Sequence, residues 1–264
     1  MISVRKRYWV RGQDSVNRPR HERTLLRVAG LAAVSALFER DPGRVERLFF
    51  EARRRGDVGG FCAALARMGK PYREVDAAEL ARVAGTVLHG GVAAIARPRP
   101  FASFDPAAVA DWARDGKPIL VLDGIGNPHN LGAIVRTAAF FGVERVILAD
   151  RPEQALPSDA SYRVAEGGLE HMTLYRAKLP AALDDLRKSY RIIGAAPESG
   201  ESAMKPVGGK PAALVLGNEE RGLDPNVLAA CDAIATIPGS GRVQSLNVAA
   251  AAAILIHALS RGRS

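Results

Sequence analysis

The sequence has few of the features that mark membrane, secreted or metal-binding proteins. Its two cysteines, Cys62 and Cys231, lie too far apart for a disulfide framework or a zinc-binding cluster. No apolar run reaches the roughly 18 residues that a membrane span needs. The N-terminus, MISVRKRYWVRG, lacks the continuous apolar stretch of a signal peptide. We therefore expect a cytoplasmic protein that uses no metal and does not enter a membrane.

Aromatic residues are also scarce, at 6% of the 264 residues, whereas hydrophobic residues make up 47%. This composition is typical of a globular protein and excludes a largely disordered one. The length allows a large core and two domains.

Acidic residues are too few to balance the basic ones, because 28 Asp and Glu face 37 Lys and Arg for a net charge of +9. The basic excess is concentrated in residues 1–27, where only Asp14 and Glu22 are acidic. Clustered arginines neutralise phosphates and release counterions, so this pattern favours a nucleic-acid partner. A solvated basic tail is the alternative interpretation.

A proline-rich segment, RPRPFASFDP, divides the chain and indicates a linker. Before it, the pattern predicts a helix around Glu22–Phe38, a strand at Val45–Phe50 and further alternating helices and strands, which is typical of a small α/β unit. We expect a basic arm at residues 1–18, a small domain at 19–98, a linker at 99–111 and a larger domain at 112–264.

After the linker, short apolar runs alternate with helical patterns. Such runs are typical of strands buried on both faces of a doubly wound parallel sheet, in which ligands bind beyond the carboxyl ends of the strands. The predicted strands are Ile119–Asp123, Arg145–Ala149, Arg191–Ala196, Ala212–Gly217 and Ala233–Pro238.

Three of the loops that follow these strands carry polar side chains. The first has Asn130 at an expected helix N-cap and Arg136 six residues later; the second has Glu219. The third presents Ser245 and Asn247 before an alanine-rich helix. Each loop alone is explained by capping or by a turn, and the glycines match neither the dinucleotide fingerprint nor a phosphate-binding P-loop.

Taken in order, the three segments NPHNLGAIVRTAAFFG, LVLGNEERGL and IPGSGRVQSLNVAAAAAIL closely resemble the motifs of the SpoU–TrmH family of RNA ribose 2′-O-methyltransferases, in the SPOUT superfamily. The resemblance covers about residues 117–260. AGLAAVSALFERDPGRVERLFF and HGGVAAIARP look like the small domain related to ribosomal protein L30e that many members carry. Asn127, where an Asp is common, and Gly239, where many members have Met, depart from the pattern.

The resemblance implies an α/β fold in which a C-terminal doubly wound parallel sheet ends in a trefoil knot and follows a small N-terminal L30e-like α/β domain. It also implies methyl transfer from S-adenosylmethionine to a ribose 2′-OH of structured RNA, with ribosomal RNA favoured over transfer RNA. The alanine-rich helix would pack against a second subunit in a homodimer, with a helix buried inside a monomer as the alternative.

The resemblance further implies two sets of site residues. The reacting side would hold Asn130, Arg136, Glu219, Ser245 and Asn247. The cofactor would be bound by Leu216, Gly217, Ile237, Ser245 and Leu246. Because an arginine stays protonated in proteins, we expect Arg136 to hold the substrate phosphate and to favour the developing alkoxide, not to act as the base.

Two other functions remain open from the sequence. One is a non-catalytic RNA-binding protein on the same fold, which would be expected to have lost Asn130, Arg136 or the Ser245–Asn247 pair. The other is a base methyltransferase of the wider superfamily, which usually lacks the arrangement of Asn130 and Arg136.

Overall fold

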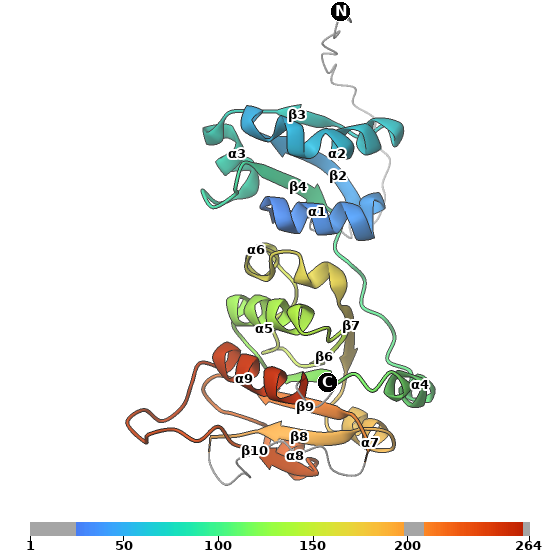
Figure 1. Ribbon diagram of the computed structural model, residues 1–264, viewed down its shortest axis with the longest axis vertical. Coiled ribbons are helices and arrows are strands. Elements are labelled where there is room, and N and C mark those ends of the chain that lie inside the picture. The colour runs from blue at the N-terminus through green and yellow to red at the C-terminus, as the bar shows by residue number, and fades with distance from the viewer. Residues whose placement is uncertain (1–24, 198–208, 261–264) are drawn as a thin grey trace, which may run out of the picture.

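The computed structural model describes residues 25–197 and 209–260 and contains two β-sheets, one in each half of the chain (Figure 1). The predicted basic arm, residues 1–18, lies outside the described residues. Within the described ranges, no helix is long and apolar enough to cross a membrane.

The first sheet has four strands in the order β1-β4-β2-β3, in which β4 is antiparallel to β1 and β2 while β3 is parallel to β2. In chain order, its elements are β1 (Leu26–Ala29), α1 (Leu31–Arg40), η1 (Pro42–Arg44), β2 (Val45–Phe50), η2 (Ala52–Arg54), α2 (Arg55–Arg67), β3 (Tyr72–Glu74), α3 (Ala77–Ala84) and β4 (Val92–Ala96).

The helix predicted around Glu22–Phe38 is wrong over Leu26–Ala29, and its first three residues lie outside the described residues. Residues Leu26–Ala29 form strand β1, with Leu26 and Val28 buried and Arg27 exposed between them. Gly30, with a φ of 99°, then turns the chain into α1. Four residues of alternation are too few to separate a strand from a helix, and the pairing with β4 decides the matter.

The second sheet has six parallel strands in the order β10-β8-β9-β5-β6-β7. Its elements are η3 (Pro106–Ala108), α4 (Val109–Arg114), β5 (Ile119–Asp123), α5 (Pro128–Phe140), β6 (Arg145–Ala149), α6 (Asp159–Ala165), η4 (Gly168–His171), β7 (Thr173–Ala177), α7 (Ala181–Arg187), β8 (Arg191–Ala195), β9 (Ala212–Gly217), α8 (Pro225–Ala229), β10 (Ala233–Ala235) and α9 (Val248–Ser260).

The parallel sheet is confirmed, with one strand more than the sequence predicts. Strand β7 lies at the edge and includes Thr173 and Arg176, so it lacks the continuous apolar run of a central strand. Its neighbour on the open side is the connecting segment, where Ala102 forms an isolated bridge with Tyr175.

Helices cover both faces of this sheet (Figure 1). One face packs on α5 and α9, and its core continues into the first sheet. The other face packs on α4, α7 and α8 around Trp112 and Leu183. The two halves therefore share one continuous apolar core.

A buried ion pair lies in the contact between the two halves. Arg44, in η1, donates from Nη1 to Oε2 of Glu170 in η4 at 2.7 Å and from Nη2 to the Tyr162 hydroxyl at 3.1 Å. The side chains of Arg44 and Glu170 are only 6% and 1% exposed. Gly167 lies beside them, where an added Cβ would be 2.9 Å from the Cβ of Ala36 in α1. The contact is therefore close and specific.

Neutralising Glu170 should strongly destabilise the protein. Glu170→Gln keeps the side-chain size but leaves the Arg44 charge buried without its counter-ion, so the free energy of unfolding should fall by about 3–5 kcal/mol. Urea unfolding followed by circular dichroism measures this loss.

The matched control is Glu74→Gln, which removes a carboxylate from an ion pair with Arg55. The Arg55 side chain is 72% exposed, so this pair lies in water. Glu74→Gln should cost less than about 1 kcal/mol. Equal, small losses in the two variants would contradict the role given to Glu170.

Candidate active site

Two of the three predicted loops leave neighbouring strands at the same edge of the second sheet. Asp123, the last residue of β5, pairs with Gly217, the last residue of β9. The Glu219 carboxylate reaches across this edge. It accepts hydrogen bonds from the amide of Gly126 at 3.0 Å, from the amide of Asn127 at 3.2 Å and from Nδ2 of Asn130 at 2.8 Å.

The third loop joins the same network. Nδ2 of Asn247 donates to Oδ1 of Asn130 at 3.1 Å, and Oδ1 of Asn247 accepts from the Ala249 amide at 2.8 Å at the start of α9. The chain of contacts Glu219–Asn130–Asn247 thus connects all three loops that sequence analysis singled out.

The expected capping role of Asn130 is wrong. Asn127 is the N-cap of α5, and its side chain accepts from the His129 amide at 2.8 Å. Asn130 lies in the first turn of the helix, where its side chain is free to link Glu219 to Asn247. Its role in the structure is to connect loops.

The pKa of Glu219 is lowered from its usual 4.5. Partial burial alone would raise this pKa, but hydrogen bonds from Asn130, Gly126 and Asn127 favour the anion and outweigh it. A carboxylate held in this way is a weak base. Glu219 therefore acts as a fixed negative charge that orients Asn130 and the loop before α5.

Gly217 and Asn218 shape the loop that carries Glu219. A Cβ on Gly217 would lie 2.4 Å from the backbone of Gly222 and Leu223, so the loop folds directly over this residue. Nδ2 of Asn218 donates to the Gly124 carbonyl at 2.8 Å, and its Oδ1 accepts from the Glu220 amide at 3.0 Å. The glycine is therefore required by the loop itself.

Arg136 lies further along α5 and has a different partner. Its guanidinium forms an ion pair with Glu166 at 2.8 Å, and the two side chains are 56% and 53% exposed. Among the described residues, no contact joins Arg136 directly to Asn130, Glu219 or Asn247. The structure thus holds the predicted phosphate-binding arginine at a carboxylate that sequence analysis did not identify.

The predicted cofactor-binding residues differ in their surroundings. Leu216 is buried at the end of β9, and Ile237 packs against the core. Ser245 is exposed and has no hydrogen bond within the described part of the chain, while Leu246 is 46% exposed. The backbone from Ile237 to Leu246 makes no hydrogen bond to other backbone groups there either. Apart from the Arg242 amide, which donates to the Ser240 hydroxyl at 3.4 Å, these backbone donors and acceptors are available to a ligand, and with the exposed Leu246 beside them they could hold the edge and face of an adenine.

The buried Gln154 and Asp123 also shape this edge and were not predicted. Oε1 of Gln154 accepts from the Gly124 amide at 3.0 Å. Asp123 accepts from the Asp224 amide at 2.9 Å and pairs with Arg151, while its burial raises its pKa. Asp123 could have been found from the sequence, because it is a polar residue at the end of the apolar strand β5. Within the described residues, no group of three His, Cys, Asp or Glu side chains is placed to hold a metal ion.

Comparison with family models identifies the family of the chain. Residues 117–257, which include the second sheet and most of α9, match the model of the SpoU rRNA methylase family. The chain belongs to this family. Residues 27–102 match a second SpoU-associated model, described as RNA 2′-O ribose methyltransferase substrate binding. The predicted family is confirmed, and S-adenosylmethionine is the methyl donor that goes with it.

Relatives of the SpoU family align over most of the chain. The tRNA/rRNA methyltransferase YfiF of Escherichia coli O157:H7, described as uncharacterized, is 34% identical over 253 residues, which are 92% of this chain and 69% of YfiF. An AdoMet-bound rRNA methyltransferase from Sinorhizobium meliloti has a TM-score of 0.74 at 23% identity, with 91% and 88% of the two chains covered. An RNA 2′-O ribose methyltransferase has a TM-score of 0.71 at 25% identity, covering 91% and 90%.

Removing the charge of Glu219 should destabilise this SpoU protein in a pH-dependent way. Because the folded pKa lies below 4.5, ionised Glu219 contributes stability above that pH, and the contribution is lost as the pH falls through the folded pKa. In Glu219→Gln the side-chain NH2 faces backbone donors, so the loss at neutral pH should be about 1–3 kcal/mol.

Chemical unfolding from acidic to neutral pH checks this expectation. Glu220→Gln is the control, since Glu220 is exposed and only its backbone amide, not its side chain, is hydrogen-bonded within the described ranges. A stability difference that stays constant with pH, or that appears equally in Glu220→Gln, would argue against the anionic network.

Proposed function

We propose that this chain transfers a methyl group from S-adenosylmethionine to the 2′-OH of a ribose in structured RNA, in the cytoplasm. One observation carries the proposal: the Glu219–Asn130–Asn247 network joins the three family motifs at one edge of the sheet, with Arg136 on the same helix as Asn130. This network of side chains, together with the two matching family models, one for an rRNA methylase and one for substrate binding in RNA 2′-O ribose methyltransferases, supports methylation of a ribose over methylation of a base.

Arg136 holds the substrate phosphate and stabilises negative charge on the attacking oxygen. S-adenosylmethionine supplies an already activated methyl group, so the protein mainly orients the ribose in line with it. The O–C bond forms as the S–C bond breaks, and the hydroxyl proton passes to the substrate phosphate or to water. Asn130, Ser245 and Asn247 orient the ribose, while Glu219 keeps Asn130 in place.

The cofactor lies against Leu216 and Gly217 and within the loop from Ile237 to Leu246. Backbone groups of this loop would hydrogen-bond to the adenine edge, and Leu246 would pack on its face. We further propose that the C-terminal segment after Ile237 forms the trefoil knot implied by the family motifs, with Ser245 reaching the cofactor from the same loop.

Ribosomal RNA is the favoured substrate over transfer RNA. The support is the first half of the chain, which matches a substrate-binding model over residues 27–102 and which we interpret as an L30e-like domain. We place the small domain at 19–98, a linker at 99–111 and the methyltransferase domain at 112–264, after a basic arm at 1–18 that adds phosphate contacts.

The protein acts as a homodimer through α5 and α9. These two helices lie against each other, and the ring of Phe141, the residue after α5, lies 5.5 Å from the ring of His257 in α9. Each also leaves a large apolar side chain in water, with Phe140 82% exposed and Ile254 46% exposed. A second copy of the chain would cover these groups, as the motif resemblance implies.

Replacing Arg136 should separate chemistry from cofactor binding. Arg136→Ala should keep S-adenosylmethionine binding and lower single-turnover methyl transfer by about 10²–10³, the scale for one lost transition-state contact. Arg136→Lys should not restore the rate, because a point charge cannot grip phosphate through two parallel hydrogen bonds.

Transfer of labelled methyl to total RNA, followed by nucleoside analysis, measures this rate and shows whether the label lies on ribose or base. Arg114→Ala, which removes an exposed arginine on α4, should leave the rate unchanged. Label on a base would refute ribose methylation, and an intact rate in Arg136→Ala would refute the role of Arg136.

Placing a charge on α9 should dissociate the dimer. Ile254→Glu would bury a carboxylate in the interface, so the variant should sediment as a monomer while remaining folded. Leu228→Glu on α8 is the control, since Leu228 is 40% exposed on the opposite face of the sheet and the dimer should persist. A monomeric wild-type protein in analytical ultracentrifugation would contradict the dimer.

A further inference from the structure

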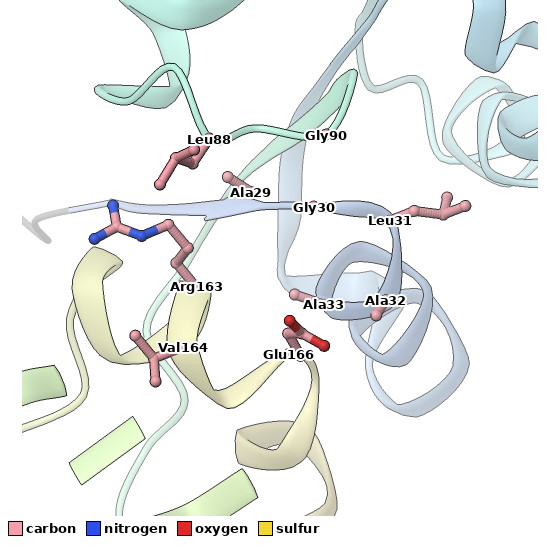
Figure 2. A pocket seen from close by; sticks show the side chains of 10 residues that line it. All are labelled: Ala29, Gly30, Leu31, Ala32, Ala33, Leu88, Gly90, Arg163, Val164 and Glu166. Atoms are coloured by element: carbon pink, nitrogen blue, oxygen red, sulfur yellow. The ribbon is translucent and has the colours of Figure 1, made fainter. Parts of the chain in front are cut away.

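A pocket of about 350 Å³ lies where the two halves of the chain meet (Figure 2). Glu166, which forms the ion pair with Arg136, is part of its lining. The walls of the pocket come from the β1–α1 turn, from the segment before β4 and from the end of α6. This size falls within the range of small-ligand sites, about 300–1,000 Å³. None of these three segments belongs to the three motifs of the second half of the chain, although the β1–α1 turn and Gly90 lie in the stretches that resemble the small N-terminal domain.

The pocket is apolar apart from two charged side chains. Leu31, Leu88 and Val164 contribute apolar surface, and Arg163 and Glu166 contribute a cation and an anion. In Figure 2 the Glu166 carboxylate lies beside the start of α1, whereas the Arg163 guanidinium lies across the pocket toward Leu88. An apolar pocket with one cationic and one anionic side chain, Arg163 and Glu166, fits a planar polar ring attached to a phosphate.

One wall of the pocket leaves bulky apolar side chains in water. Leu88 is 70% exposed and the preceding residue, Val87, is 79% exposed. The Leu88 amide donates to the Thr86 hydroxyl at 3.1 Å, so the local turn presents these side chains outward. Two adjacent exposed aliphatic residues at the rim offer a surface on which a base packs.

Glu166 belongs both to this pocket and to the candidate active site. It lines the pocket and forms the 2.8 Å ion pair with Arg136. Its φ of 44° lies in the left-handed region, which is uncommon for a residue with a side chain. The next residue, Gly167, also has a positive φ. The backbone is thus held in an unfavourable conformation that places the carboxylate between Arg136 and the pocket.

We propose that this pocket binds an unpaired guanine of the substrate RNA, at or next to the methylated nucleotide, and that Glu166 recognises it. A carboxylate accepts two parallel hydrogen bonds, and guanine alone among the four bases presents two adjacent donor groups, N1–H and the N2 amine, on its Watson–Crick edge. Arg163 holds the attached phosphate. The inference rests on the proposed function, because it names the RNA feature that the same enzyme selects.

Binding of the guanine would also free Arg136. When both oxygens of Glu166 accept from the base, the ion pair with Arg136 is replaced, and the guanidinium becomes available for the substrate phosphate. An exposed ion pair contributes little to stability, so this exchange requires only a modest part of the RNA binding energy. Recognition of the correct base and delivery of Arg136 would then be one event.

A pool of hairpin RNAs with a randomised loop tests the proposal. After reaction with the wild-type protein, RNAs with guanine at one position at or beside the methylated nucleotide should be enriched about 10- to 100-fold, the discrimination expected from one bidentate contact. Glu166→Gln presents one acceptor and one donor, so it should lose most of this preference. The control is Glu39→Gln, which removes an exposed carboxylate at the other end of α1 and should keep the preference.

A second measurement does not depend on methyl transfer. Nuclear magnetic resonance titration with GMP should shift the backbone signals of Glu166 and Leu88 in the wild-type protein. AMP, CMP and UMP should shift them at least about tenfold more weakly. Leu88→Ala, at an exposed position, should weaken GMP binding without unfolding the protein.

The outcomes separate this inference from the proposed function. Methylation of the pool without a base preference, or a preference that Glu166→Gln retains, would overturn the guanine pocket while leaving ribose methylation intact. If the protein transferred no methyl to RNA, the proposed function would fail, and GMP titration would decide the pocket: selective shifts support it and equal or absent shifts overturn it.

Discussion

Two opposite charges, on Arg44 and Glu170, lie almost fully out of water where the two sheets meet. Burying such charges is costly unless they stay paired, so their 2.7 Å contact tolerates little relative movement of the two halves. The Tyr162 hydroxyl accepts from the same guanidinium, and burial, followed by the nearby Glu170 charge, raises the pKa of Tyr162 to about 12. The phenol therefore stays protonated and neutral beside the pair.

This contact leads directly to the site through one short segment. Glu170 lies in η4, and Gly168 at the start of η4 packs so closely on α5 that an added Cβ would be 3.1 Å from the Arg136 Cα. Two residues earlier, Glu166 binds the Arg136 side chain. Five residues, 166–170, thus connect the first half of the chain, the backbone of α5 and the guanidinium that would hold the RNA.

Sequence reasoning found those parts of the fold and site that depend on local pattern. Five of the six parallel strands are predicted because each reads as a short apolar run, including β10 at one edge of the sheet. Strand β7, at the other edge, includes Thr173 and Arg176, and β1 is only four residues long, so both carry too little pattern. Asn130, Glu219 and Asn247 were expected together because each follows a strand. Glu166 was not expected, since its partner Arg136 lies thirty positions away and only tertiary packing joins them.

The site thus combines a rigid part with an exchangeable one. Glu219 accepts three hydrogen bonds from the loop before α5 and from Asn130, so its charge and the Asn130 side chain are set before any ligand arrives. Arg136, in contrast, is held by a single half-exposed carboxylate, a contact worth about 0–1 kcal/mol, and a phosphate can displace it. In the proposed reaction, binding energy gained by the first half of the chain would be used to move Arg136, while the rigid network would keep the ribose and the methyl donor aligned.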